Sequence, residues 1–155
     1  MAMRITTALL CDFAQVRDGL LFVSSGAVTR LFRHDLPAPL GVMVAVVIDV
    51  PLEDAGVPHT LRVQVVNRHN NELAGLTSTF EVGNDGVFPH EVQQVPLVLS
   101  VTGVTARSWG THQIRLWLDE EPAERLTFYL VPSPTGAGAA APIVEPEDLE
   151  PEERP

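Results

Sequence analysis

The sequence predicts an all-β fold, an antiparallel β-sandwich of about eight strands, with a barrel as the structural alternative. Three observations support this prediction. Apolar residues recur with period two from Met3 to Val131, turn-forming residues separate the apolar runs, and almost no segment has the periodicity of a helix. At 155 residues, the chain is long enough to bury one full-sized core.

The candidate strands follow one another at short intervals. Alternation is clear where Leu61, Val63 and Val65 share one face and polar side chains occupy the other, as a strand with one wet face requires. The candidate segments are residues 3–13, 19–25, 27–33, 40–50, 59–68, 73–82, 92–102, 111–118 and 124–131.

Three segments depart from simple alternation. Residues 40–48 are continuously apolar, so we expect a central strand covered on both faces, or one that crosses between sheets. Pro96 interrupts residues 92–102, which indicates an edge strand or a bulge because proline cannot donate to a ladder. Residues 51–57 could form one helical turn, with acidic residues near its N-terminus.

Turn chemistry separates the strands, most clearly at Asp18-Gly19. Asp12 is expected near the end of the first strand, where its carboxylate would accept backbone N–H bonds from the turn that follows. Gly19 would supply the turn conformation, and Gly26 would allow a sharp bend or the close approach of another backbone.

Composition excludes several classes of function. The formal net charge of -10 would repel the phosphates of nucleic acids, so we expect no nucleic-acid partner. All ten basic residues are arginine, which indicates a GC-rich bacterial coding bias. The single cysteine, Cys11, excludes a disulfide framework and is typical of the cytoplasm. No apolar run is long enough to span a membrane, and the residues before Cys11 do not form a lipoprotein signal.

The composition changes after Pro132, which divides the chain into three parts. Residues 1–132 form the predicted β-sandwich domain, and residues 133–142 (SPTGAGAAAP) read as a flexible linker. Residues 143–155 form an acidic tail with six acids and one arginine, expected to be disordered when alone.

Four stretches carry a resemblance to a known family. They read ALLCDFAQVRDGLLFVSSG, APLGVMVAVVIDVP, AGVPHTLRVQVV and WGTHQIRLWLDEEPAERLTFYLV. In these the chain resembles a family of bacterial proteins known only as a domain of unknown function, over about 130 residues up to the linker. The resemblance implies a sandwich of immunoglobulin-like character and brings no catalytic residue with it. The chain departs from the family pattern at Ser24 and Ser25, where glycines are usual.

No group of residues predicts catalysis, a cofactor or a metal site. The histidines lack the spacing of metal ligands, and Cys11 occupies an alternating strand position typical of a buried small hydrophobe. Ser24 and Ser25 lack the motif of an exposed nucleophile. An acidic cluster in the last predicted turn is explained by a solvated hairpin; its members are Asp119, Glu120, Glu121 and Glu124. The histidines are His34, His59, His69, His90 and His112.

The last hairpin offers a candidate protein-binding face. Pairing Leu118 with Leu126 and Leu116 with Phe128 on the buried face would set the other side chains outward. Trp117 would then lie opposite Thr127, and Arg115 opposite Tyr129. Tryptophan, tyrosine and arginine are enriched at binding hot spots. The alternative is that this face is covered by the N-terminal strand or by a loop.

The function that fits these observations is a non-catalytic interaction or assembly module, an adaptor or scaffold that self-associates. Its contacts would be a strand edge or the face of Arg115, Trp117 and Tyr129. The tail could provide a second contact, because its apolar residues stand among prolines and acids. These apolar residues are Ile143, Val144 and Leu149.

A purely solubilising role is the alternative for the tail. The alternative function is a sandwich that binds a small molecule or carbohydrate through its loops. The candidate contacts in that case are Trp109, His112, Asp85 and His90.

Overall fold

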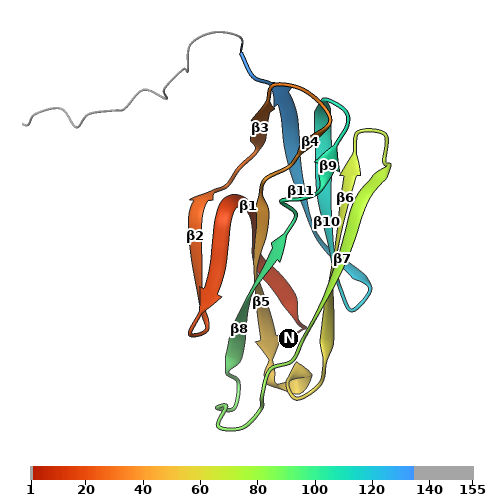
Figure 1. The fold of residues 1–155 in the computed structure, drawn as a ribbon. Helices are drawn as coiled ribbons and strands as arrows, with labels where there is room; N and C mark the ends of the chain where they lie inside the picture. The colour runs from red at the N-terminus through yellow and green to blue at the C-terminus, as the bar shows by residue number, and fades with distance from the viewer. Residues whose placement is uncertain (1, 135–155) are drawn as a thin grey trace, which may run out of the picture.

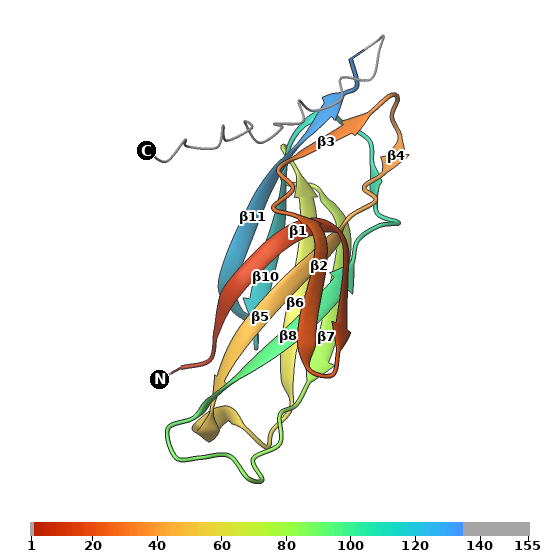
Figure 2. The same ribbon diagram turned by 90° about the vertical axis from the view of Figure 1, so that its left-hand side faces the viewer.

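A computed structural model describes residues 2–134, and the acidic tail lies outside the described residues. The chain forms an all-β sandwich in which a four-stranded sheet packs against a five-stranded sheet (Figures 1 and 2). The four-stranded sheet has the order β2 (Leu20–Gly26), β1 (Arg4–Arg17), β5 (Met43–Pro51) and β8 (Val92–Ser100). The five-stranded sheet has the order β3 (Arg30–Arg33), β11 (Glu121–Pro132), β10 (Gly110–Leu118), β6 (His59–Asn67) and β7 (Glu72–Phe80).

The short elements complete the fold. Strands β4 (Ala38–Pro39) and β9 (Thr105–Ala106) form a separate two-stranded sheet that the sequence pattern missed, because two residues are too few to alternate. The expected helical turn is a 3-10 helix at Leu52–Asp54. Within residues 2–134, no helix has the length and apolar character needed to cross a bilayer.

One core lies between the two sheets. The inward side chains of β5 include Val44, Val46 and Ile48, and each is fully buried. They pack in the same cluster as Ile114 of β10 and Phe128 of β11. The alternating burial of β6 and β10 explains why their period-two pattern is so clear in the sequence.

Strand β5 is central and covered on both faces, as its unbroken apolar run indicates. Its Ala45 belongs to a second, smaller cluster with Cys11 and Ala14. Strand β8 is the edge expected from Pro96, which pairs with Val47 in a ladder that has no bulge.

Two features of the sheets differ from the sequence prediction. Strand β1 continues to Arg17, four residues beyond the predicted end. Strands β3 and β11 run parallel, whereas the prediction was an entirely antiparallel sandwich. The chain reaches this parallel pairing because the segment after β2 passes from the four-stranded sheet to the five-stranded sheet, where β3 lies beside the end of β11 (Figure 2).

Candidate functional site

The β1–β2 hairpin carries five of the eleven exposed large apolar side chains among residues 2–134, more than any other hairpin of the fold. Phe13 is 49% exposed, Leu20 is 62% exposed and Phe22 is 48% exposed. The ladder pairs Phe13 with Ser24, Gln15 with Phe22 and Arg17 with Leu20, so these side chains share one face of the hairpin. Val16 and Val23 add further exposed apolar surface.

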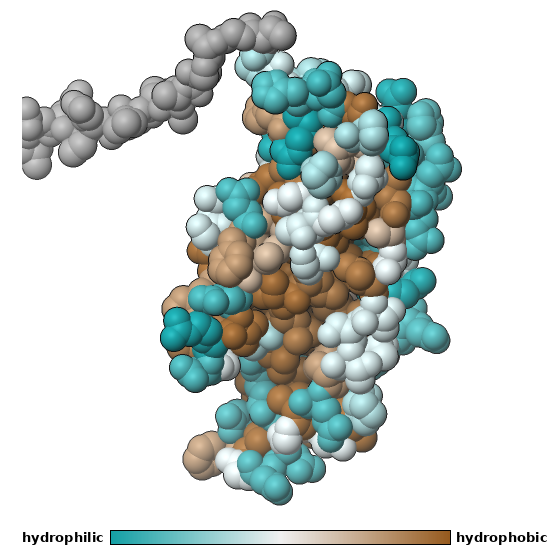
Figure 3. Space-filling model, viewed as in Figure 1, coloured by the Kyte–Doolittle hydropathy of each residue, from teal (hydrophilic) through white to brown (hydrophobic). Residues whose placement is uncertain are grey.

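The opposite side of this hairpin is held to the sandwich. Ala14 is buried, and Leu21 packs beside it against Met43 and Val98 of the four-stranded sheet. The Ala14 backbone N–H points at the Met43 sulfur, 3.4 Å away. The hairpin therefore stands as a flap against the outer face of this sheet, at the left of Figure 1. Figure 3 shows apolar surface across the middle of this view, between the hairpin and β7.

Among residues 2–134, strand β2 pairs with β1 alone, so its other edge has no partner strand there. Its sequence, LLFVSSG, contains no charged residue and no proline. Charged residues and prolines are the usual protection of an edge strand against pairing with another chain. This edge, together with the apolar side chains beside it, is the strongest candidate for a binding surface.

The structure corrects the predicted role of Asp12. This residue lies within β1 and not at its end, its side chain is exposed, and no hydrogen bond to its carboxylate occurs among residues 2–134. The β1–β2 turn is instead formed by Asp18 and Gly19, whose φ values are 51° and 73°. Gly26 packs closely, because a Cβ there would lie 3.1 Å from the Val23 side chain and 3.4 Å from that of Leu9.

The predicted register of the last hairpin is wrong. Trp117 pairs with Pro122 and Arg115 with Arg125, whereas Tyr129 lies opposite Thr111. The reason is a two-residue turn, in which Asp119 and Glu120 have φ values of 46° and 71°, followed by a register shift at Leu116/Trp117. The sequence prediction places residues 119–123 between the two strands, whereas only Asp119 and Glu120 form the turn.

The outward face of this hairpin nevertheless contains the predicted residue types. Trp117 is partly buried beneath Arg62 of β6, whose guanidinium carbon lies 4.1 Å from the ring centroid. Tyr129 is 46% exposed and stands beside Arg30 of β3. The predicted alternative, cover by the N-terminal strand, does not apply, since β1 belongs to the other sheet.

His59 and Asp119, which the sequence pattern did not pair with each other, form a clamp at one end of the sandwich. His59 Nδ1 lies 2.6 Å from Asp119 Oδ2, and its Nε2 lies 2.6 Å from the Asp54 carbonyl oxygen. Both neighbours can accept a hydrogen bond, so the protonated imidazolium, which donates from both ring nitrogens, fits both contacts. The other carboxylate oxygen of Asp119 accepts the Thr60 N–H at 2.8 Å.

The pKa values of the clamp follow from these contacts. Burial alone would lower the pKa of His59, but the Asp54 carbonyl and the Asp119 carboxylate outweigh it and raise this pKa. Burial would raise the pKa of Asp119, but the Thr60 N–H and His59 outweigh it and lower this pKa. Each partner therefore favours the charged form of the other.

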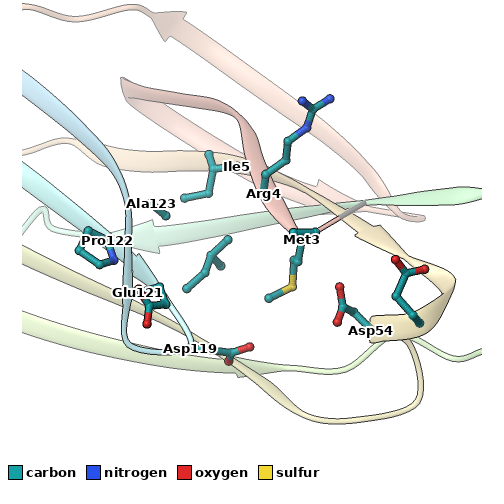
Figure 4. Close-up of a pocket in the computed structure, with 11 residues that line it drawn as sticks. Met3, Arg4, Ile5, Asp54, Asp119, Glu121, Pro122 and Ala123 are labelled. Carbon is teal, nitrogen blue, oxygen red and sulfur yellow. The ribbon is translucent and has the colours of Figure 1, made fainter.

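A cleft of about 680 Å³ opens beside the clamp. Figure 4 shows Met3 pointing into this cleft and Arg4 pointing away from it, with Asp54 and Asp119 at its border. Within residues 2–134, no three histidine, cysteine or acidic side chains are grouped to hold a metal ion. The arrangement is that of a structural clamp that ties the β10–β11 turn to the start of β6.

Other predicted residues do not gather into a site. Cys11 is fully buried, and this burial, with Asp12 next to it, raises the pKa of its thiol. His112 is buried against Phe128, with Nε2 lacking a hydrogen-bond partner among the described residues.

The four suggested ligand contacts, Trp109, His112, Asp85 and His90, do not form one group. Trp109 precedes β10, whereas Asp85 and His90 lie in the loop after Phe80, next to the opposite end of β10. The tail residues Ile143, Val144 and Leu149 lie outside the described residues.

Comparison with known proteins gives a family but no activity. The model of a family of unknown function (DUF6941) matches residues 6–131, which is nearly the whole described sandwich. No curated protein matches the sequence.

Proposed function

Because the chain belongs to DUF6941, a family of unknown function, we propose a function from the geometry alone: a non-catalytic assembly module that self-associates through β2. The observation that carries this proposal is the free, uncharged edge of β2 with Phe13, Leu20 and Phe22 exposed beside it. Two copies would pair their β2 edges antiparallel about a two-fold axis. The same patch would then serve both partners.

The size of the apolar surface supports a dimer contact. Phenylalanine rings bury about 200 Å² each when fully covered, so the half-exposed rings of Phe13 and Phe22 offer roughly 200 Å² together, to which Leu20 adds on the same face. A standard interface covers about 800 Å² per partner, of which about 450 Å² is apolar. These three side chains therefore provide a large part of the apolar area that such a contact needs.

The other sheet edges are less suited to pairing. Strand β8 contains Pro96, and β3 has four residues. Strand β7 is longer, but its exposed residues are mainly glycine, threonine and Leu76. The large apolar side chains thus favour β2 over the other three edges.

Sedimentation velocity over a wide concentration range tests this function. We expect the full chain to form a species of twice 16.8 kDa, and Phe22→Lys to shift it to the monomer. Phe88→Lys is the matched control, because Phe88 is 75% exposed in the β7–β8 loop, away from the hairpin. A wild-type chain that stays monomeric, or equal weakening by both variants, would contradict the proposal.

The immunoglobulin-like character of the fold and the cellular location of the protein are parts of the same proposal. An immunoglobulin-like character is supported by two packed sheets around a single core. A bacterial cytoplasmic location is supported by the all-arginine basic residues and the single buried cysteine.

The tail and the outer face of β10–β11 are further proposed contacts. Small-molecule binding remains the second proposal, and the cleft beside Met3 is the feature that supports it. A thermal-shift screen with sugars that raises the melting temperature of the wild type would favour this second proposal.

A further inference from the structure

Three arginines surround Trp117 on the outer face of the five-stranded sheet. Arg62 stacks on the Trp117 ring from β6, and these two residues are cross-strand partners. Arg115 of β10 lies directly opposite Arg125 of β11. Directly opposed residues of an antiparallel pair share a face, so the three guanidinium groups and the indole form one patch, called here the arginine face.

The arginine face carries more positive than negative charge: Glu124 is the one acid that lines its hollow among residues 2–134, beside Arg115 and Arg125. Like charges directly opposite each other are destabilising. Among residues 2–134, no carboxylate forms an ion pair with Arg62, Arg115 or Arg125. The Arg115 guanidinium donates to the neutral Gln113 side chain, and the nearby Glu124 carboxylate accepts the backbone N–H of Arg125. The chain has twice as many acidic as basic residues, so three arginines gathered on one face favour an anionic occupant of that face.

The surface also offers an apolar recess. A hollow of about 420 Å³ is lined by the apolar Leu116, Trp117, Pro122 and Ala123 and by the charged Arg115, Glu124 and Arg125. Its volume is sufficient for one or two aliphatic side chains. The face therefore suits a peptide that combines carboxylates with aliphatic residues.

Residues 143–155 of the same chain have this composition. They carry Glu145, Glu147, Asp148 and three further acids against one arginine, so their net charge is -5. The aliphatic residues Ile143, Val144 and Leu149 stand among these acids.

The tail can reach the arginine face from its point of attachment. Arg125 precedes Pro132, the last residue of β11, by seven positions, or about 23 Å along the strand. The ten residues 133–142 can span up to about 33 Å, so residue 143 can return to the level of Arg125. On the outer face of β11, the side chains of Tyr129 and Thr127 lie between Pro132 and Arg125. A short linker also gives an effective concentration on the order of millimolar.

We propose that the acidic tail, residues 143–155, binds in cis to the arginine face. Its carboxylates pair with Arg62, Arg115 and Arg125, and an aliphatic side chain fills the recess beside Trp117. This contact is separate from the β2 edge, so it stands or falls independently of the proposed self-association.

Paramagnetic relaxation in the full chain tests the proposal. A nitroxide is attached at Glu153→Cys in a Cys11→Ala background, and the amide and indole signals are recorded with and without reduction of the label. We expect loss of the Trp117 indole signal and of the Arg115 and Arg125 amides in the oxidised form. The Trp109 indole and the β8 amides serve as internal controls and should stay sharp.

Charge variants and mixing complete the test. Arg115→Glu with Arg125→Glu should restore the lost signals, as should salt near 1 M, where the Debye length falls to about 3 Å. A loss of signal spread uniformly over the chain would overturn the proposal. So would a loss at Trp117, Arg115 and Arg125 that is as large in the double variant as in the wild type. A mixture of two samples separates a contact within one chain from a contact between chains. One sample carries the nitroxide without isotope enrichment, and the other is isotope-enriched without the nitroxide. Signal loss in that mixture would overturn the cis contact in favour of a second copy.

Discussion

Asp119→Asn tests whether the His59 clamp is an ion pair. Asparagine tolerates the positive φ of residue 119 and still accepts the Thr60 N–H, so the substitution removes the charge and leaves the turn intact. A charge-assisted hydrogen bond is worth about 1.5–3 kcal/mol. Because the Asp119 side chain is 46% exposed and solvent weakens the interaction, we expect a loss near the lower end of this range, about 1.5 kcal/mol.

The pH dependence of this loss has a definite sign. The pKa of His59 is raised in the folded state. Its contribution to the free energy of unfolding is therefore complete below the unfolded pKa of 6.5, and it is lost as the pH rises through the folded pKa. The lowered pKa of Asp119 makes its contribution present above 3.8, and lost as pH falls through the folded pKa. The effect of Asp119→Asn should therefore be largest in mildly acidic solution and smaller in alkaline solution. In alkaline solution the His59 ring is neutral, so one of its ring nitrogens presents a lone pair to an acceptor, either the Asp119 carboxylate or the Asp54 carbonyl oxygen.

Urea unfolding of the wild type and Asp119→Asn at a series of pH values measures this difference. Glu120→Gln is the matched control, because Glu120 has a positive φ in the same turn and is exposed. We expect less than about 0.5 kcal/mol from the control at every pH. If Asp119→Asn lowers the free energy of unfolding by the same amount from acidic to alkaline pH, the charged clamp is refuted.

Two further outcomes follow from the β1–β2 region. Cys11 should react with a thiol reagent only on the timescale of unfolding, because it is buried and its pKa is raised; rapid native labelling would contradict its packing. Gly19→Ala should cost about 1 kcal/mol in urea unfolding, because the residue has a φ of 73° although a Cβ at this position would meet no atom within 4 Å; an unchanged midpoint would contradict the turn geometry.

The strands could be predicted from sequence because their pattern is local. Alternation located β6 and β10, continuous apolarity marked β5 as covered on both faces, and Pro96 marked β8 as an edge. Each of these signals depends on neighbouring residues and on which side chains the sheet can bury.

The proposed binding surface could not be predicted in the same way. Phe13 and Phe22 alternate like core residues, and only the path of the hairpin away from β5 leaves them exposed. The clamp joins His59 to Asp119, which are 60 positions apart, so no local pattern connects them. The arginine face depended on the register of β10 and β11, which a turn of two residues determined.

Amide hydrogen exchange at low and high protein concentration tests the proposed self-association most directly. Pairing of two copies through β2 predicts that concentration slows exchange in Leu20–Gly26, where one edge is free in the single chain. The amides of β7 and β3, which form the edges of the other sheet, should exchange at the same rate at both concentrations. Protection confined to those edges, or no change in β2 while a dimer is present, would contradict the account.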